Sequence, residues 1–176
     1  MAGHNKFSKI KHQKAKNDAQ KSKVFGKLVR FITVEAKKAG GNLKSPGLSL
    51  AIEKAKKENM PNDTIDRAIK KATTENSASM ESIVYEAYGP GGIAILIDVL
   101  TDNRNKAAQE IKHILSLNGS ELAAPGSASW AFTKTHEGWS ANSLMPLEDA
   151  DIEKLQILVE ALEENDEVQD VFTNAE

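Results

Sequence analysis

Apolar residues between positions 24 and 72 recur at the three- and four-residue spacing of amphipathic helices. The first run begins at Val24 and ends at Gly40-Gly41, the second begins at Ser45-Pro46, and the third follows Pro61. Proline is tolerated at the first position of a helix, and glycine ends one. Three short amphipathic helices with brief connections predict a small antiparallel bundle over residues 24–73.

The segment that precedes this bundle has a different pattern, because apolar residues are sparse from position 1 to 23 and lysines recur throughout. Such a segment has no apolar face to bury and cannot fold alone. We therefore expect a basic arm over residues 1–23.

From residue 82 the pattern predicts strands as well as helices. Strands are expected over 83–88 and 93–100, on either side of a turn at Gly89-Pro90-Gly91-Gly92. A helix then follows Thr101-Asp102-Asn103 and is closed by Asn118-Gly119. The small, polar and acidic stretch 73–82 is the expected boundary between the two domains.

Residues 127–134 alternate in polarity, which predicts a strand that buries Trp130. We expect this strand to share one sheet with the segment after Trp139. Three further elements are expected, namely a possible strand at 140–145, a helix at 152–162 and a closing strand at 168–172. Helices on one face of a mainly antiparallel sheet predict an α+β fold: a basic arm and three-helix domain followed by a ferredoxin-like α+β sandwich over 82–176.

The charges of the chain are divided between its two parts, although the whole of it carries a net charge of only −2. The first 71 residues hold 18 Lys and Arg against 6 Asp and Glu, and the remaining 105 hold 5 against 19. Like charges gathered at one end repel one another unless a partner of opposite sign compensates them, and nucleic acid is the expected partner. The alternative is a solvated lysine-rich surface with no ligand.

The candidate nucleic-acid-binding residues are basic side chains that can neutralise phosphates, a kind of contact that positions a protein without reading bases. They are Lys6, Lys9, Lys11, His12, Lys14, Lys16, Lys21, Lys23, Lys27, Arg30, Arg67, Lys70, Lys71 and Arg104.

Arg104 differs from the other candidates because it lies between a strand and a helix. Asp102 and Asn103 beside it are explained by helix capping alone, and Arg104 is placed to reach a phosphate or carboxylate.

Several classes of protein are disfavoured by the residues that the chain lacks. It has no cysteine, its four histidines show no metal-ligand spacing, and no catalytic constellation or cofactor motif is visible, so we expect a non-enzymatic protein without metal or cofactor.

The Gly89–Gly92 stretch lacks the ending of a P-loop and is expected to be a turn. Trp130 with Phe132, and Tyr85 with Tyr88, could stack on bases, but a place in the core is favoured. With no apolar membrane span or secretory signal, the expected location is the cytoplasm, and no membrane or small-molecule partner is expected.

Four stretches that occur in order along the chain resemble the YebC/PmpR family of probable transcriptional regulators, which also includes mitochondrial translational activators of cytochrome oxidase subunit I. The resemblance covers residues 1–134, and residues 155–176 resemble the family's C-terminal end. The four stretches are Met1–Phe7 with Ile10–His12, Asn59–Lys71, Tyr88–Gly92 and Leu100–Asn105.

The resemblance implies a helical N-terminal domain, α+β domains after it and no enzymatic activity. It implies a DNA-binding transcriptional regulator or, alternatively, a ribosome-associated factor that binds ribosomal RNA and assists translation of difficult, proline-rich sequences. One departure is large: near residues 133–142 only about ten residues stand where the usual members carry a further α+β domain of roughly sixty residues, so we expect two domains here.

Overall fold

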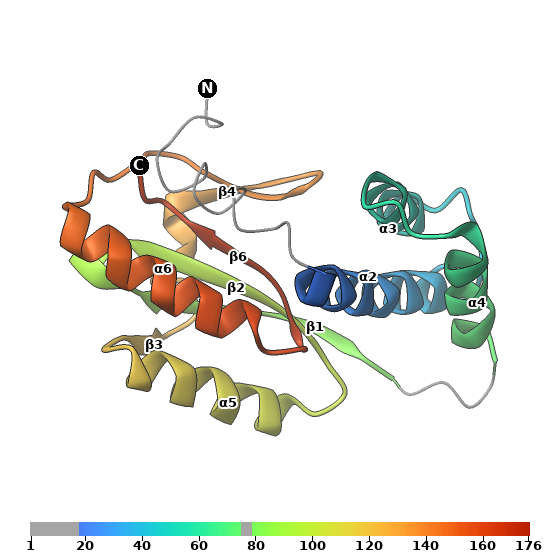
Figure 1. Cartoon of the computed structure of the whole chain (residues 1–176), viewed down its shortest axis with the longest axis horizontal. Coiled ribbons are helices and arrows are strands. Elements are labelled where there is room, and N and C mark those ends of the chain that lie inside the picture. The colour runs from blue at the N-terminus through green and yellow to red at the C-terminus, as the bar shows by residue number, and fades with distance from the viewer. Residues whose placement is uncertain (1–17, 75–78) are drawn as a thin grey trace. The chain divides into compact units, whose positions relative to one another are not determined.

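The computed structural model describes residues 18–74 and 79–176, and the side chains from residue 21 onward (Figure 1). The described chain divides into two compact units, a helical unit that ends at Glu81 and a mixed unit that begins at Ser82. Each unit has its own hydrophobic core.

The helical unit contains α2 (Asp18–Lys38), α3 (Pro46–Lys57) and α4 (Asn62–Ala72). Both α3 and α4 follow the expected boundaries, with Pro46 at the start of α3. Gly40 and Gly41 turn the chain after α2 with φ values of 57° and 81°, a backbone region that glycine adopts without strain. The three helices bury a shared apolar core made of Ile32, Ala36, Leu48, Ala51, Ala55, Met60, Ile65, Ala68 and Ala72.

The start of α2 differs from the prediction, because the helix begins at Asp18 and not at Val24. Residues 18–23 contain Ala, Gln and Lys, which are good helix formers, and no glycine or proline. Adding a turn to an existing helix costs far less than starting one, so this segment is helical without an apolar face of its own.

The mixed unit is built on a four-stranded sheet in the order β3-β1-β2-β6, which confirms the α+β class. Its strands are β1 (Glu81–Tyr88), β2 (Ala94–Thr101), β3 (Glu121–Ala123) and β6 (Val168–Thr173). The helix α5 (Arg104–Leu117) connects β2 to β3, and β1 lies between those two strands, which is a split β-α-β arrangement. The strand pairs β1–β3 and β2–β6 are antiparallel.

Both long helices of this unit cover the same face of the sheet (Figure 1). These are α5 and α6 (Asp149–Glu163), and every second residue of β2 packs against them. The core between sheet and helices includes Ile93, Ile95, Ile97, Val99, Ile111, Leu115, Leu155, Leu158 and Leu162.

The opposite face of the sheet is covered in part by the short helix η2 (Ser129–Ala131) and by a hairpin of β4 (Phe132–Thr135) and β5 (Gly138–Ala141). Ala128, Ala131 and Phe132 pack there against Ala94 and Leu96 of β2. The two hairpin strands form a sheet of their own.

The predicted strand over residues 127–134 is confirmed only from Phe132, where β4 begins, and the prediction is otherwise wrong in two respects. Residues 129–131 form a 3-10 turn, and Trp130 is 65% exposed where we expected it to be buried. The strand that follows pairs only with β5 and does not join the main sheet. Ala128, Ala131 and Phe132, in and beside this turn, pack against the sheet. The sequence therefore alternates in polarity as a strand does, although its backbone forms a 3-10 turn.

Candidate nucleic-acid interface

The basic side chains gather on the helical unit. Residues 18–74 hold 13 Lys and Arg against 6 Asp and Glu, whereas residues 79–176 hold 5 against 18. Of the predicted candidates, Lys6, Lys9, Lys11, His12, Lys14 and Lys16 lie outside the described residues. The structure places Lys21, Lys23, Lys27 and Arg30 on α2, Arg67, Lys70 and Lys71 on α4, and Arg104 on α5 of the other unit.

The amphipathic pattern of α4 sets the direction of its basic residues. Ile65, Ala68 and Ala72 face the core, so Arg67, Lys70 and Lys71 lie on the outer side. Lys70 and Lys71 form no ion pair with a carboxylate among the described residues, and both lie in the last turn of the helix. Cations in that turn also interact favourably with the helix dipole, which gives them a structural role besides any contact with a ligand.

The C-terminal end of α3 presents a similar basic pair that the sequence pattern did not single out. Lys57 forms an ion pair with Glu53 at 3.2 Å, whereas the exposed Lys56 has no ion pair with a described carboxylate. Ion pairs of this exposed kind are worth little, so Lys57 is still available to an anionic ligand. The signal that could have found Lys56 is its place in the last helical turn, the same feature that selected Lys70 and Lys71.

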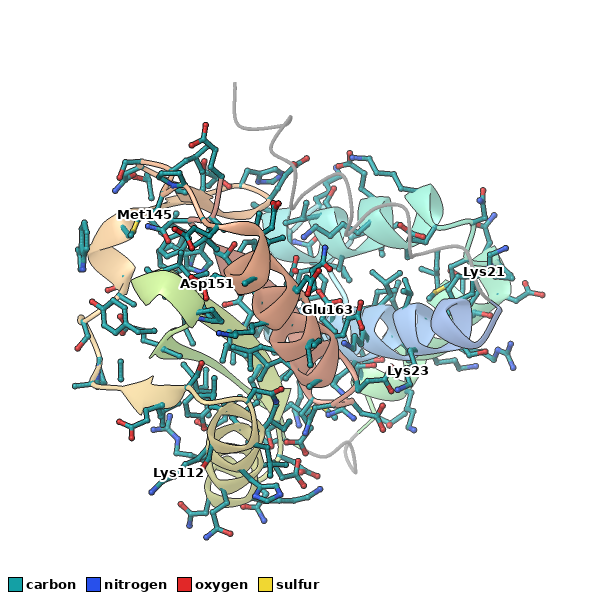
Figure 2. All side chains as sticks on the ribbon, turned by 60° about the vertical axis from the view of Figure 1, so that its left-hand side comes forward. Lys21, Lys23, Lys112, Met145, Asp151 and Glu163 are labelled. Atoms are coloured by element: carbon teal, nitrogen blue, oxygen red, sulfur yellow. The ribbon has the colours of Figure 1, made fainter. Side chains whose placement is uncertain are left out.

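On α2, the labelled side chains of Lys21 and Lys23 lie near the start of the helix (Figure 2). Lys38, in its last turn, pairs with Glu35 at 3.2 Å. The helix therefore carries basic residues along its whole described length.

Arg104 stands on a rigid turn in the mixed unit. The buried hydroxyl of Thr101 accepts a hydrogen bond from the backbone N–H of Asn103 at 3.0 Å and donates to the Asn103 carbonyl at 3.1 Å. The Asn103 side chain caps α5 by accepting the N–H of Lys106 at 3.1 Å, as the sequence predicted. The Tyr85 hydroxyl donates to the carbonyl of Arg104 at 3.4 Å.

The mixed unit otherwise offers little to a phosphate. Lys106 lies 3.7 Å from a carboxylate oxygen of Glu110 and 3.8 Å from one of Glu167, and Lys154 lies 3.6 Å from Asp151. The unit has 18 acidic against 5 basic residues, so its net charge stays strongly negative; Asp151 and Glu163 on α6 are two of these acidic residues (Figure 2).

No metal or phosphate-cradling site is evident in the parts of the chain that the structure covers. Within residues 18–74 and 79–176, no three His, Asp or Glu side chains are grouped to hold a metal ion. The Gly89–Gly92 stretch is a turn between β1 and β2, as expected, in which the N–H of Gly92 bonds the Gly89 carbonyl at 3.0 Å. None of the described helices has both the length and the apolar character to cross a bilayer.

Two family descriptions match the sequence. "TACO1/YebC protein N-terminal domain" matches residues 5–75, and "TACO1/YebC second and third domain" matches residues 80–137. The second match ends within the turn between β4 and β5.

Several curated bacterial relatives are named "Probable transcriptional regulatory protein". One from Halothermothrix orenii is 45% identical over 175 residues, which cover 98% of this chain and 66% of the relative. One from Fervidobacterium nodosum is 46% identical over 171 residues, covering 96% and 68%. One from Thermotoga maritima is 48% identical over 136 residues, covering 76% and 54%. The chain thus spans between about half and about two thirds of the length of these relatives.

A solved structure also resembles the chain. The crystal structure of a conserved hypothetical protein, Aq1575, from Aquifex aeolicus has a TM-score of 0.81 and 31% sequence identity, and the likeness covers 95% of each chain.

Proposed function

Because this chain belongs to the TACO1/YebC family, whose bacterial relatives are named as probable transcriptional regulatory proteins, we propose that it is a non-enzymatic regulator that binds DNA. The basic arm and the helical unit supply the contact, and the cytoplasm is its setting. One observation carries the proposal: the helical unit combines a large excess of basic residues with exposed lysines such as Lys56, Lys70 and Lys71 that no described carboxylate neutralises.

A second candidate is the ribosome-associated translation factor that binds ribosomal RNA. The observation that favours it is the scarcity of arginine in the basic region, where Arg30 and Arg67 are the only two arginines among the first 71 residues. Specific reading of a major groove relies on arginine, asparagine and glutamine at base edges, whereas lysine contacts to phosphates serve DNA and RNA alike.

We also propose that the β4–β5 hairpin stands where longer relatives carry a further α+β domain. The support is the end of the family match at residue 137, together with the self-contained pairing of Thr135 with Gly138 at the hairpin tip. We propose no role of that further domain for this chain.

Binding is expected to depend on the basic helices and to weaken steeply with salt. In the triple variant Lys56→Gln, Lys70→Gln, Lys71→Gln, the slope of log affinity against log salt for duplex DNA should become shallower by about 0.9 for each phosphate that is no longer neutralised. Fluorescence anisotropy of a labelled duplex measures this slope. The matched control Lys112→Gln, Lys134→Gln, Lys154→Gln makes the same change in net charge within the mixed unit, and equal weakening by the two variants would contradict the proposal.

The two candidates are separated by sedimentation of the full chain in a cell lysate, with and without dissociation of the ribosomes. A regulator that acts on DNA stays at the top of the gradient, whereas a ribosomal factor travels with a subunit and is released by the helical triple substitution.

Arg104 gives a separate expectation, since the Tyr85 hydroxyl bonds its carbonyl and the Thr101 hydroxyl bonds the backbone of the preceding Asn103. A side chain on a hydrogen-bonded backbone loses less entropy on contact, and neighbouring lysines can substitute for one another, so Arg104→Ala should weaken activity in cells more than removal of any single lysine among residues 1–23. Arg104→Lys should restore activity only in part, because a bidentate contact needs the planar guanidinium. If Arg104→Ala keeps full activity and an unchanged free energy of unfolding, residues 101–105 serve only to cap the helix.

A further inference from the structure

Trp130 is exposed to solvent but held in place. Its indole Nε1 donates to the hydroxyl of Tyr88 at 3.5 Å, and the Tyr88 hydroxyl donates in turn to the carbonyl of Ser127. The side chain of Asn142 donates to the carbonyl of Trp130 at 3.0 Å. Tyr88 is 39% exposed, so the two rings form a surface that we call the aromatic platform.

A buried carboxylate is hydrogen-bonded to the loop that carries Trp130. Glu86 is 7% exposed and lies on β1 two residues before Tyr88. Its Oε1 accepts the backbone N–H groups of Ala128 at 2.9 Å and Ser129 at 2.7 Å, and its Oε2 accepts that of Gly126 at 2.6 Å. Burial alone raises the pKa of this carboxyl, but these backbone hydrogen bonds, with one from the Ser129 side chain, outweigh burial and hold the pKa of Glu86 below its ordinary value.

The core does not explain this construction. Ala128, Ala131 and Phe132 pack against the sheet, whereas Trp130 is not part of that cluster. The ionised Glu86 carboxylate is buried, and its hydrogen bonds to the loop compensate the cost of desolvation. The loop that it fixes presents its largest side chain, Trp130, to solvent. Tryptophan and tyrosine held in one geometry lose little entropy on contact, which is why such residues dominate the energy of protein interfaces.

The charges around the platform indicate which kind of partner it fits. Residues 122–133 carry no charged side chain. Glu121 lies opposite Tyr88 in the pairing of β1 with β3, so its carboxylate is on the same face of the sheet as Tyr88. The platform thus has an uncharged centre with Glu121 at its side, in a unit with 5 basic against 18 acidic residues. Such a surface repels phosphates and attracts a basic polypeptide.

We propose that Trp130 and Tyr88 form a docking site for a basic protein, in which the aromatic platform anchors an apolar side chain and the negative charge of the unit attracts Lys and Arg. This assigns a partner to the mixed unit, of which the proposed nucleic-acid contact uses only Arg104. Proteins bound to nucleic acid are commonly basic, so one chain would engage both components of a nucleoprotein assembly. Two contacts joined in one chain reinforce each other through effective concentration.

The test selects random short peptides displayed on phage against the immobilised full chain at about 0.15 M salt. Enriched peptides should carry an apolar residue flanked by Lys or Arg. A synthetic peptide of the enriched sequence should bind the wild type at least about tenfold more tightly than Trp130→Ala, as truncation of an interface tryptophan requires. The matched control is Leu117→Ala, which removes an apolar side chain that is 72% exposed on α5 and should bind like the wild type.

A second variant covers the case in which Trp130→Ala disturbs the fold. Tyr88→Phe keeps the ring and removes the hydroxyl that orients Trp130, and it should weaken peptide binding about threefold, by analogy with the removal of one hydrogen bond. Equal unfolding midpoints for wild type and variants confirm that the fold is intact.

Four outcomes overturn the proposal. Peptides that bind Trp130→Ala and wild type equally, or that are enriched without Lys and Arg, exclude a basic partner at the platform. Weaker binding of a labelled single-stranded oligonucleotide by Trp130→Ala would instead assign the platform to base stacking. If Trp130→Ala changes the sedimentation of the isolated chain, the platform is instead a contact with a second copy of the chain. None of these readouts depends on the duplex-binding measurement that tests the proposed function.

Discussion

Replacement of Glu86 by Ala is expected to lower the free energy of unfolding of the mixed unit by about 3–5 kcal/mol, among the largest effects of any single substitution. The variant leaves the N–H groups of Gly126, Ala128 and Ser129 without their acceptor in a partly buried loop. Each orphaned group costs about 1–3 kcal/mol, and water that enters the vacated space recovers part of this cost. Urea unfolding followed by tryptophan fluorescence measures the decrease in stability.

The chain is well suited to this measurement, because its two tryptophans, Trp130 and Trp139, both lie in the mixed unit and report on it alone. The control is Glu121→Ala, which removes an exposed carboxylate from the neighbouring strand β3 and should change stability by less than about 0.5 kcal/mol. A Glu86→Ala variant as stable as the control would mean that the loop is held by its apolar contacts and not by the carboxylate.

The same residue gives a pH dependence whose sign is fixed. The pKa of Glu86 is lower in the folded protein than in the unfolded chain, where a glutamate titrates near about 4.3. Its contribution to stability is therefore complete above that value and is lost as the pH falls toward and through the lower folded pKa. The difference in unfolding free energy between wild type and Glu86→Ala should narrow over that range, and parallel pH profiles would show that Glu86 is not the titrating group.

Gly138→Ala is expected to destabilise the mixed unit by about 2–4 kcal/mol, because it combines backbone strain with steric overlap. Gly138 has φ of 140°, and a Cβ atom there would lie 2.6 Å from Cζ and 2.9 Å from Cε1 of Phe172. The half-buried ring packs against the cluster that contains Ala94 and Leu96, so turning it aside would cost those contacts. The hairpin would have to lift from the sheet, and the fluorescence of Trp139 on β5 should report this as a lower unfolding midpoint.

A second glycine separates the two contributions. Gly119 has φ of 71°, and a Cβ atom there would meet nothing within 4 Å, so Gly119→Ala introduces strain alone and should cost about 1 kcal/mol. If both variants are destabilised equally, the contact with Phe172 contributes nothing and the hairpin tip is loosely packed.

The helical unit could be predicted from sequence because its signals are local. The spacing of Leu48, Ala51 and Ala55 defines the buried face of α3, and Pro46 and Pro61 mark where α3 and α4 start. The early start of α2 was missed because residues 18–23 are helical by propensity and by continuity with a packed helix, and neither produces an apolar pattern.

The loop that carries Trp130 could not be predicted in the same way. Its conformation depends on hydrogen bonds to Glu86, which lies 40 to 43 residues earlier in the chain, and a buried glutamate looks like any surface glutamate in a sequence. The alternation of Ala128, Trp130 and Phe132 suggested a strand, but a turn fixed from a distant residue satisfied the inward positions instead. The charge of the sequence predicted the basic character of the candidate interface. The ion pair that distinguishes Lys57 from Lys56 was identified only in the structure.

The division of charge between the two units changes the meaning of the isoelectric point for this molecule. At the pH where the whole chain is neutral, residues 18–74 still carry an excess of cations and residues 79–176 an excess of anions, so neither unit is near its own neutral point. The molecule then carries two units of opposite charge. Oppositely charged units of neighbouring copies attract each other, and dissolved salt screens this attraction. We therefore expect its solubility near the isoelectric pH to rise with ionic strength, and we expect it to bind both cation- and anion-exchange matrices at that pH.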